Sequence, residues 1–303
     1  MAFRVLLIEN EVNIKLNLDN LVITKEGKDI WVPIRDLSMI VLDNLKTNLT
    51  SRMLCALAKN NVGIIICDQE HLPIGFYSSF DNHSRISKTI KYQTEKDENF
   101  YSLLWEKIVK EKIKNQIRVL KILDKSEDIQ NKMNEFIKQM QHNDENNREA
   151  HSAKIYFNEL MECSFSRRND DILLNSGLNY GYTIIRSFLA RVCVGYGLNT
   201  QLGIHHKNEY NRFNFVDDII EPIRPFIDFF AYNLLKEEKY FTPNHRRELI
   251  NFLNHKVLYN NKKMYICNML EEYVYNIAGY FEGRKEEIIF PNVEDYIGKE
   301  NEV

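Results

Sequence analysis

The stretch WEKIVKEKIKNQIRVLK, residues 105–121, decides the fold class of this chain. One face of an amphipathic helix is expected in it, formed at helical spacing by Trp105, Ile108, Lys112 or Ile113, Ile117 and Leu120. The stretch lies inside the run 76–176, which contains no glycine and no proline, the two residues that most often interrupt a helix. Long helices are therefore expected through the middle of the chain.

The first eighty residues carry β-strand patterns instead. Apolar and polar residues alternate strictly from Val12 to Asp19, which is typical of a half-buried strand. The short apolar runs 39–42 and 62–67 are typical of buried strands, and a helix capped by Thr50 or Ser51 is expected between them. The chain is therefore expected to be an α+β protein.

Its expected organisation is a small β-rich domain over residues 1–80, a connector over 81–97 and a larger all-α domain over 98–303. Further helices are expected near residues 129–140, 150–160, 184–192, 226–235, 245–253 and 267–281. A hairpin turn is expected at Asn260-Asn261, and the charged tail from Arg284 is expected to fray.

Composition limits the class of protein. The chain has 303 residues and a net charge of −3, so it does not present itself as a whole to a polyanion. Its five cysteines are isolated and never spaced as CxxC, which argues against a disulfide framework or a zinc ribbon. The short apolar run at the N-terminus predicts neither a signal peptide nor a membrane span. A cytoplasmic protein without a membrane partner is expected.

The segment 202–228, LGIHHKNEYNRFNFVDDIIEPIRPFID, holds the residues best suited to chemistry. If residues 217–221 form a helical turn, Asp218 and Glu221 lie on one face and can point at one divalent ion. Pro222 opposes this, because it biases Glu221 away from helical geometry. The alternative is an acidic, solvated helix start with Asn214 as its cap. Spacing alone leaves both readings open.

Three further residues carry no decisive pattern of their own. His205 and His206 are adjacent, so only one of them should reach the acidic cluster. Glu149 heads an expected helix, where a carboxylate is unremarkable. Spacing does not bring Glu149 next to either histidine.

Basic residues gather in two places. Residues 106–121 hold six Lys and Arg against two Glu, and a second group comprises Arg167, Arg168, Arg186 and Arg191. Solvated helix faces with ion pairs would explain both groups, and contact with phosphates is the alternative.

Several motifs together resemble the CRISPR-associated integrase, the enzyme of spacer acquisition. They are RVLLIENEVNIKLNLDNLVI (4–23), LTSRMLCALAKNNVGIIICDQEHLPIGFY (49–77), NREAHSAKIYF (147–157), LNYGYTIIRSFLARVCVGYGLNTQLGIHHKNE (178–209) and DDIIEPIRPFID (217–228). The stretches HHKNEYNRFNF (205–215) and EPIRP (221–225) look most like the type II branch. One departure is Ala150, where the family usually has glycine.

The resemblance implies that Glu149, His205 and Glu221 converge on Mg²⁺ or Mn²⁺, with Asp218 as a supporting carboxylate. His205 is chosen over His206 because it follows Leu-Gly-Ile as the family's histidine does. The imidazole has to be neutral to bind an ion, so activity is expected to fall below about pH 6.5. Arg167, Arg168 and Arg186 are expected to contact DNA phosphates.

The implied reaction joins the 3′-hydroxyl ends of a short double-stranded DNA fragment to the CRISPR repeat by transesterification. The implied partners are a second copy of the chain, bound through the β-rich domain, and a small second adaptation protein. The type II branch adds a ring-shaped DNA-end-binding protein and the RNA-guided effector nuclease. Two other readings stay open: a structure-specific nuclease on branched DNA and a non-catalytic DNA-binding scaffold.

Overall fold

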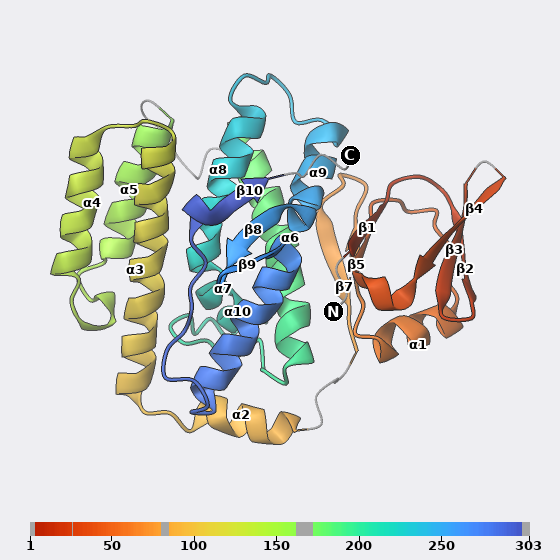
Figure 1. Cartoon of the computed structure of the whole chain (residues 1–303), viewed down its shortest axis with the longest axis horizontal. Helices are drawn as coiled ribbons and strands as arrows, with labels where there is room; N and C mark the ends of the chain where they lie inside the picture. The colour runs from red at the N-terminus through yellow and green to blue at the C-terminus, as the bar shows by residue number, and fades with distance from the viewer. Residues whose placement is uncertain (1–3, 26, 80–84, 162–171, 299–303) are drawn as a thin grey trace.

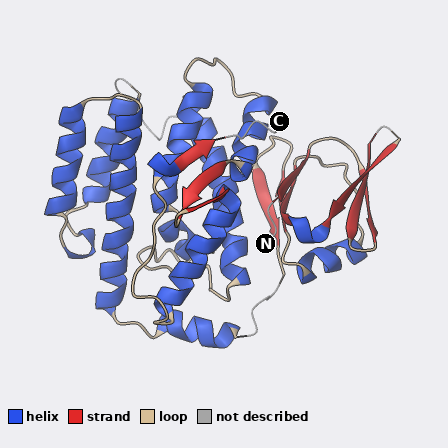
Figure 2. Cartoon of the chain, in the orientation of Figure 1, coloured by secondary structure: helices blue, strands red, loops and turns tan. Residues whose placement is uncertain are grey.

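The computed structural model describes residues 4–25, 27–79, 85–161 and 172–298. Most strands gather at one end of the molecule, and helices with a few strands among them fill the larger remainder (Figure 2). This arrangement confirms the expected α+β class, with β-rich structure first and helical structure after it.

Two sheets form the β-rich part. The first has the strand order β1 (Arg4–Ile8), β5 (Leu37–Leu42), β6 (Gly63–Cys67) and β7 (Pro73–Tyr77); the first three strands are parallel and β7 is antiparallel. The second is an antiparallel meander of β2 (Asn13–Asn17), β3 (Asn20–Lys25) and β4 (Lys28–Pro33), which confirms the alternating strand. Helix α1 (Ser51–Lys59) starts at its expected cap, where the Thr50 side chain accepts a hydrogen bond from the Met53 amide.

Strand β5 joins the β-rich part to the helices. All six of its residues are buried. Met39 and Val41 face the large core that the helices share, while Ile40 and Leu42 face the smaller core of the β-rich part. A strand covered on both faces has no need of polar residues, which explains the continuous apolar run in the sequence.

Nine helices follow in the described residues (Figure 1). They are α2 (Ile86–Thr94), α3 (Glu98–Ile122), α4 (Glu127–Gln139), α5 (Arg148–Leu160), α6 (Leu173–Gly195), α7 (Asn214–Ile219), α8 (Arg224–Leu235), α9 (Pro243–Asn251) and α10 (Ile266–Phe281). Helix α2 lies within the expected connector. Helices α3, α4 and α5 pack side by side, and α6 packs on α8 through Gly181, where a Cβ would stand 2.7 Å from Ile227 Cγ2.

A third sheet lies among the helices, so the helical part also contains strands. Strands β8 (Lys256–Tyr259) and β9 (Lys262–Tyr265) form the expected hairpin, with Asn260 and Asn261 both at positive φ. Strand β10 (Tyr296–Gly298) pairs with β8, and Val293 just before it is buried. The expectation of a frayed tail from Arg284 is therefore wrong up to Gly298, because apolar residues in the tail reach the core.

A helix that spans a membrane has to be long and apolar. Within the four described ranges, none of the helices has the length and apolar character that a crossing requires.

Candidate active site

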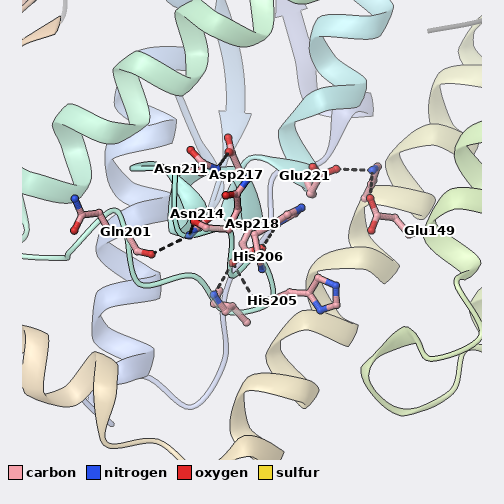
Figure 3. Close-up of polar contacts among 12 residues, drawn as sticks. Glu149, Gln201, His205, His206, Asn211, Asn214, Asp217, Asp218 and Glu221 are labelled. Carbon is pink, nitrogen blue, oxygen red and sulfur yellow. Dashed lines mark hydrogen bonds and ion pairs between the residues drawn. The ribbon is translucent and has the colours of Figure 1, made fainter. Parts of the chain in front are cut away.

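Glu149 and Glu221 meet at the ammonium group of Lys112. Glu149 Oε1 lies 2.6 Å from Lys112 Nζ, and Glu221 Oε2 lies 2.5 Å from the same nitrogen. Figure 3 shows the two carboxylates converging on that nitrogen from different segments. Glu149 stands in the first turn of α5, Glu221 opens a short 3₁₀ helix (Glu221–Ile223), and Lys112 lies in the middle of α3.

These charges are stable although they are buried. Burial alone would raise the pKa of Glu221, but Arg224 and Lys112 outweigh it and lower that pKa to about 2. Burial likewise opposes the charge of Lys112, yet Glu221 and Glu149 raise the pKa of its ammonium. Arg224 completes the group, with its Nε 2.8 Å from Glu221 Oε1. Two carboxylates and two cations therefore balance each other.

The backbone before α5 places Glu149. Asp144 accepts hydrogen bonds from the backbone amides of Arg148 (2.7 Å) and Glu149 (3.0 Å), which the helix itself leaves without partners. Asn147 takes a left-handed conformation, with φ at 52°, and so turns the chain into the helix. Glu149 consequently starts the helix on the side of α3, where its side chain is 27% exposed.

Asp218 holds the loop that carries the two histidines. It is fully buried and accepts backbone hydrogen bonds from Ile204 (2.5 Å), His205 (3.0 Å) and His206 (3.1 Å). Gly203 lets the loop come this close, since a Cβ there would stand 2.1 Å from the carbonyl oxygen of His206. Asp218 is therefore a positioning residue for the loop.

The two histidines have different surroundings. The His206 ring binds Asp218 through Nδ1 at 2.5 Å, and this hydrogen bond raises its pKa. The His205 ring stacks on Trp105 with ring centroids 4.3 Å apart, and burial lowers its pKa. Within the part of the chain that the structure describes, the His205 ring nitrogens have no hydrogen-bond partner. His205 therefore offers a neutral ring with both nitrogens available, whereas His206 has its Nδ1 bound to Asp218 and only its Nε2 left for a ligand.

The structure brings together only part of the predicted constellation. Helix α7 ends at Ile219, and the 3₁₀ helix that begins at Glu221 turns its carboxylate toward Lys112. Asp218 points instead at the histidine loop, so Asp218 and Glu221 do not share a face; Pro222 had indicated this. No group of three His, Cys, Asp or Glu side chains in the described ranges is arranged to hold a metal ion. Lys112 stands between the carboxylates.

Several residues of this site are absent from the sequence-based assignment, Lys112 and Trp105 among them. Lys112 carried a signal, because it falls on the apolar face of its helix, where a charge needs a partner. Trp105 carried none beyond its place on that same face, since nothing in the sequence shows which ring will stack on it.

The basic groups have partners in the structure. Arg186 lies 2.7 Å from Asp217, so its positive charge is already paired with a carboxylate. Arg191 is buried and lies 2.5 Å from Glu271, which excludes it from contact with phosphates. On α3, Lys110 pairs with Glu106 and Lys114 with Glu111, as solvated helix faces do. Arg167 and Arg168 lie outside the described residues.

Known proteins resemble this chain over most of its length. The family model described as CRISPR associated protein Cas1 matches residues 5–257. The CRISPR-associated endonuclease Cas1 of Neisseria meningitidis serogroup C (strain 8013) is 33% identical over 261 residues, which cover 85% of each chain.

Two solved structures share the fold. A casposase bound to an integration product has a TM-score of 0.76 at 19% identity and covers 97% of this chain and 94% of its own. A Cas6-RT-Cas1–Cas2 complex has a TM-score of 0.71 at 17% identity; the match covers 97% of this chain and 36% of that one. The extent of the family match and the 33% identity to a curated relative show that this chain belongs to the Cas1 family of CRISPR-associated proteins, the integrase family that its motifs resemble.

Proposed function

We propose that the chain is a metal-dependent DNA integrase that joins the 3′ ends of a short DNA fragment to CRISPR repeat DNA. The observation that carries this proposal is the meeting of Glu149 and Glu221 at one cation, although they come from distant segments. Trp105, which stacks on His205, lies seven residues before Lys112 and so occupies the same face of α3. The imidazole of His205 thus faces the same side of the site.

The chemistry of these donors suits a divalent ion, although the Lys112 ammonium stands between the two carboxylates. Glu221 Oε2 is buried and already contacts a cation, the Lys112 ammonium at 2.5 Å, so it lies where positive charge is held. Two carboxylates and one neutral imidazole suit Mg²⁺ or Mn²⁺. Glu149, Glu221 and His205 would hold the ion, and Asp218 would fix the loop that presents His205. When bound, such an ion would neutralise negative charge on the attacked phosphate and on the leaving oxygen.

The proposed reaction is a transesterification. The 3′-oxygen of the fragment forms a bond to a phosphorus atom of the repeat and loses its proton, while the bond from that phosphorus to the repeat's own 3′-oxygen breaks and that oxygen gains a proton. The number of phosphodiester bonds does not change, so no external energy is needed. The chain's own contribution is positioning and electrostatics, which dominate phosphoryl transfer.

The proposed partners follow from the relatives. One related structure is a casposase bound to an integration product, and another contains Cas2. We propose duplex DNA, the CRISPR repeat and a small Cas2-like protein as partners here, with the ring-shaped DNA-end-binding protein and the effector nuclease as additional ones. Residues 1–80 would form the homodimer contact, 81–97 the connector and 98–303 the catalytic domain. Half-exposed Trp31 and Ile30 on β4 suit such a contact.

Two other functions use the same residues differently. A nuclease on branched DNA would use water in place of the 3′-hydroxyl, and analysis of joined against cleaved strands separates the two. A non-catalytic scaffold would bind DNA, but it would show no Mn²⁺ binding that is lost when Glu149 or Glu221 is replaced. Phosphate contacts by Arg167, Arg168 or Arg186 would appear as a flatter salt dependence of DNA binding when one of them is replaced.

A half-site integration assay tests the proposal. A fluorescent DNA fragment and a supercoiled plasmid with the repeat are incubated in Mg²⁺ with wild type, Glu149→Gln, His205→Asn or His206→Asn. We expect Glu149→Gln and His205→Asn to lose strand joining while DNA binding and the folded state persist. The matched control His206→Asn keeps an amide donor toward Asp218 and is expected to retain joining.

Two outcomes contradict the assignment. Joining by His205→Asn at the wild-type rate would remove His205 from the site, and loss of joining in His206→Asn alone would exchange the two roles. Cleaved but never joined products from the wild type would favour the nuclease.

A further inference from the structure

The charges around Lys112 already cancel. Glu149 and Glu221 supply two negative charges, and Lys112 and Arg224 supply two positive ones, each within hydrogen-bond distance of a carboxylate. The neighbouring carboxylate of Asp144 is held by backbone amides at the start of α5. Asp218 is likewise held by backbone amides and by His206. The site is thus electrically satisfied by the chain's own residues.

Lys112 also occupies the position that an ion needs. Its nitrogen contacts one oxygen of each carboxylate at 2.6 and 2.5 Å, and only 9% of its side chain is exposed. Mg²⁺ and Mn²⁺ bind carboxylate oxygens at about 2.1 Å, so an ion bridging the same two oxygens would overlap the ammonium group. The ion and the ammonium are therefore in competition for one place.

Displacement of Lys112 changes the charge balance. A divalent ion neutralises both carboxylates, which leaves the charges of Lys112 and Arg224 without partners in a largely buried site. Such an excess of positive charge is unfavourable unless an anion enters with the ion. A DNA phosphate is that anion under the proposed function, and the flexible four-carbon stem of lysine allows its ammonium to move onto it.

We propose that Lys112 is a resident counter-cation that couples divalent-ion binding to DNA binding. It holds the two carboxylates in place before the ion arrives, and it transfers to a DNA phosphate when the ion enters. This inference rests on the proposed function, because it requires an ion at Glu149 and Glu221. Since coupling between two ligands is reciprocal, Mn²⁺ strengthens DNA binding by the same factor as DNA strengthens Mn²⁺ binding.

Mn²⁺ titration of the full chain, followed by the electron paramagnetic resonance signal of the free ion, tests the coupling. Wild type, Lys112→Met, Lys112→Arg and the control Lys114→Met are titrated with and without a blunt duplex oligonucleotide. Lys114 lies on the same helix but pairs with Glu111 at the surface. Glu149→Gln with the same DNA measures the Mn²⁺ that the DNA itself takes up.

For the wild type and Lys114→Met, we expect DNA to strengthen Mn²⁺ binding about 10-fold. Lys112→Met should bind Mn²⁺ more tightly than wild type without DNA and gain little when DNA is added. Lys112→Arg keeps the positive charge and should resemble wild type. Circular dichroism establishes that each variant is folded, and the comparison of wild type with and without DNA needs no variant.

Two results overturn the inference: equal Mn²⁺ affinity of the wild type with and without DNA, or Lys112→Met binding no more tightly than Lys114→Met. Mn²⁺ binding that is unchanged in both Glu149→Gln and Glu221→Gln removes the ion site itself and, with it, the proposed function. Failure of the coupling alone leaves the proposed function intact, so the two failures are distinguishable.

Discussion

Replacement of Asp218 by asparagine separates a positioning residue from a direct ligand. The neighbouring aspartate offers a matched control, since Asp217→Asn makes the same chemical change one residue earlier. The Asp217 carboxylate faces Arg186 near the surface, with 17% of its side chain exposed, whereas Asp218 is fully buried beneath the histidine loop. A large difference between the two variants would therefore report on burial and on the loop.

The structure sets the size of the effect. In Asp218→Asn, one oxygen can still accept from the amides of Ile204 and His205, but the other becomes an NH₂ group that faces both the amide and the ring Nδ1 of His206. The two charge-assisted hydrogen bonds from His206 are disrupted and the other two become neutral bonds, which costs about 3 kcal/mol or more in the free energy of unfolding. Asp217→Asn weakens a partly exposed ion pair and should cost about 1 kcal/mol or less.

Urea denaturation of both variants in metal-free buffer measures these costs, and the half-site assay measures activity. Asp218→Asn is expected to lower both stability and joining, because the loop that presents His205 loosens. Asp217→Asn is expected to keep joining near the wild-type level. Stabilities of the two variants within about 0.5 kcal/mol of each other would refute the reasoning. Unchanged stability with lost Mn²⁺ binding in Asp218→Asn would instead make Asp218 a ligand.

Two further predictions concern buried charges. Arg191→Leu leaves Glu271 without its buried partner and should lower the free energy of unfolding by about 3 kcal/mol, without changing the salt dependence of DNA binding by the folded protein. The exposed control Arg35→Leu should stay within about 0.5 kcal/mol of wild type. A flatter salt dependence of DNA binding in Arg191→Leu would make Arg191 a phosphate contact. Folding lowers the pKa of Glu221 from 4.5 to about 2, so its ionised carboxylate stabilises the folded state above pH 4.5. This contribution is lost as the pH falls through about 2. The loss amounts to about 3 kcal/mol in metal-free buffer; a pH dependence of the urea midpoint that is identical in wild type and Glu221→Gln would contradict it.

Much of the fold was predictable from local pattern. The apolar run at Met39–Leu42, the Thr50 cap and the Asn260-Asn261 turn each specify a conformation through side chains close in sequence, and the structure confirms all three. The strand β10 was not predictable in this way. Its pairing with β8 joins the end of the described chain to a hairpin some forty residues earlier. The intervening tail is rich in charged residues, so its composition does not indicate that Val293 is buried.

The candidate site divides along the same line. The sequence indicated that residues 202–228 hold the residues best suited to chemistry, that Pro222 biases Glu221 away from helical geometry, and, through family motifs, which residues to consider. It could not choose firmly between two adjacent histidines, because that choice depends on which ring reaches Trp105 and which reaches Asp218.

The position of Lys112 between Glu149 and Glu221 is visible in the folded chain alone. Periodicity shows which face of a helix is buried, and it placed Lys112 on such a face, but it does not show which other element packs there. The partners of a buried charge are set by the docking of α5 and of the 3₁₀ helix at Glu221 against α3. Docking minimises the exposed apolar surface of the whole chain, and for that reason residues 37 positions apart meet at one ion pair.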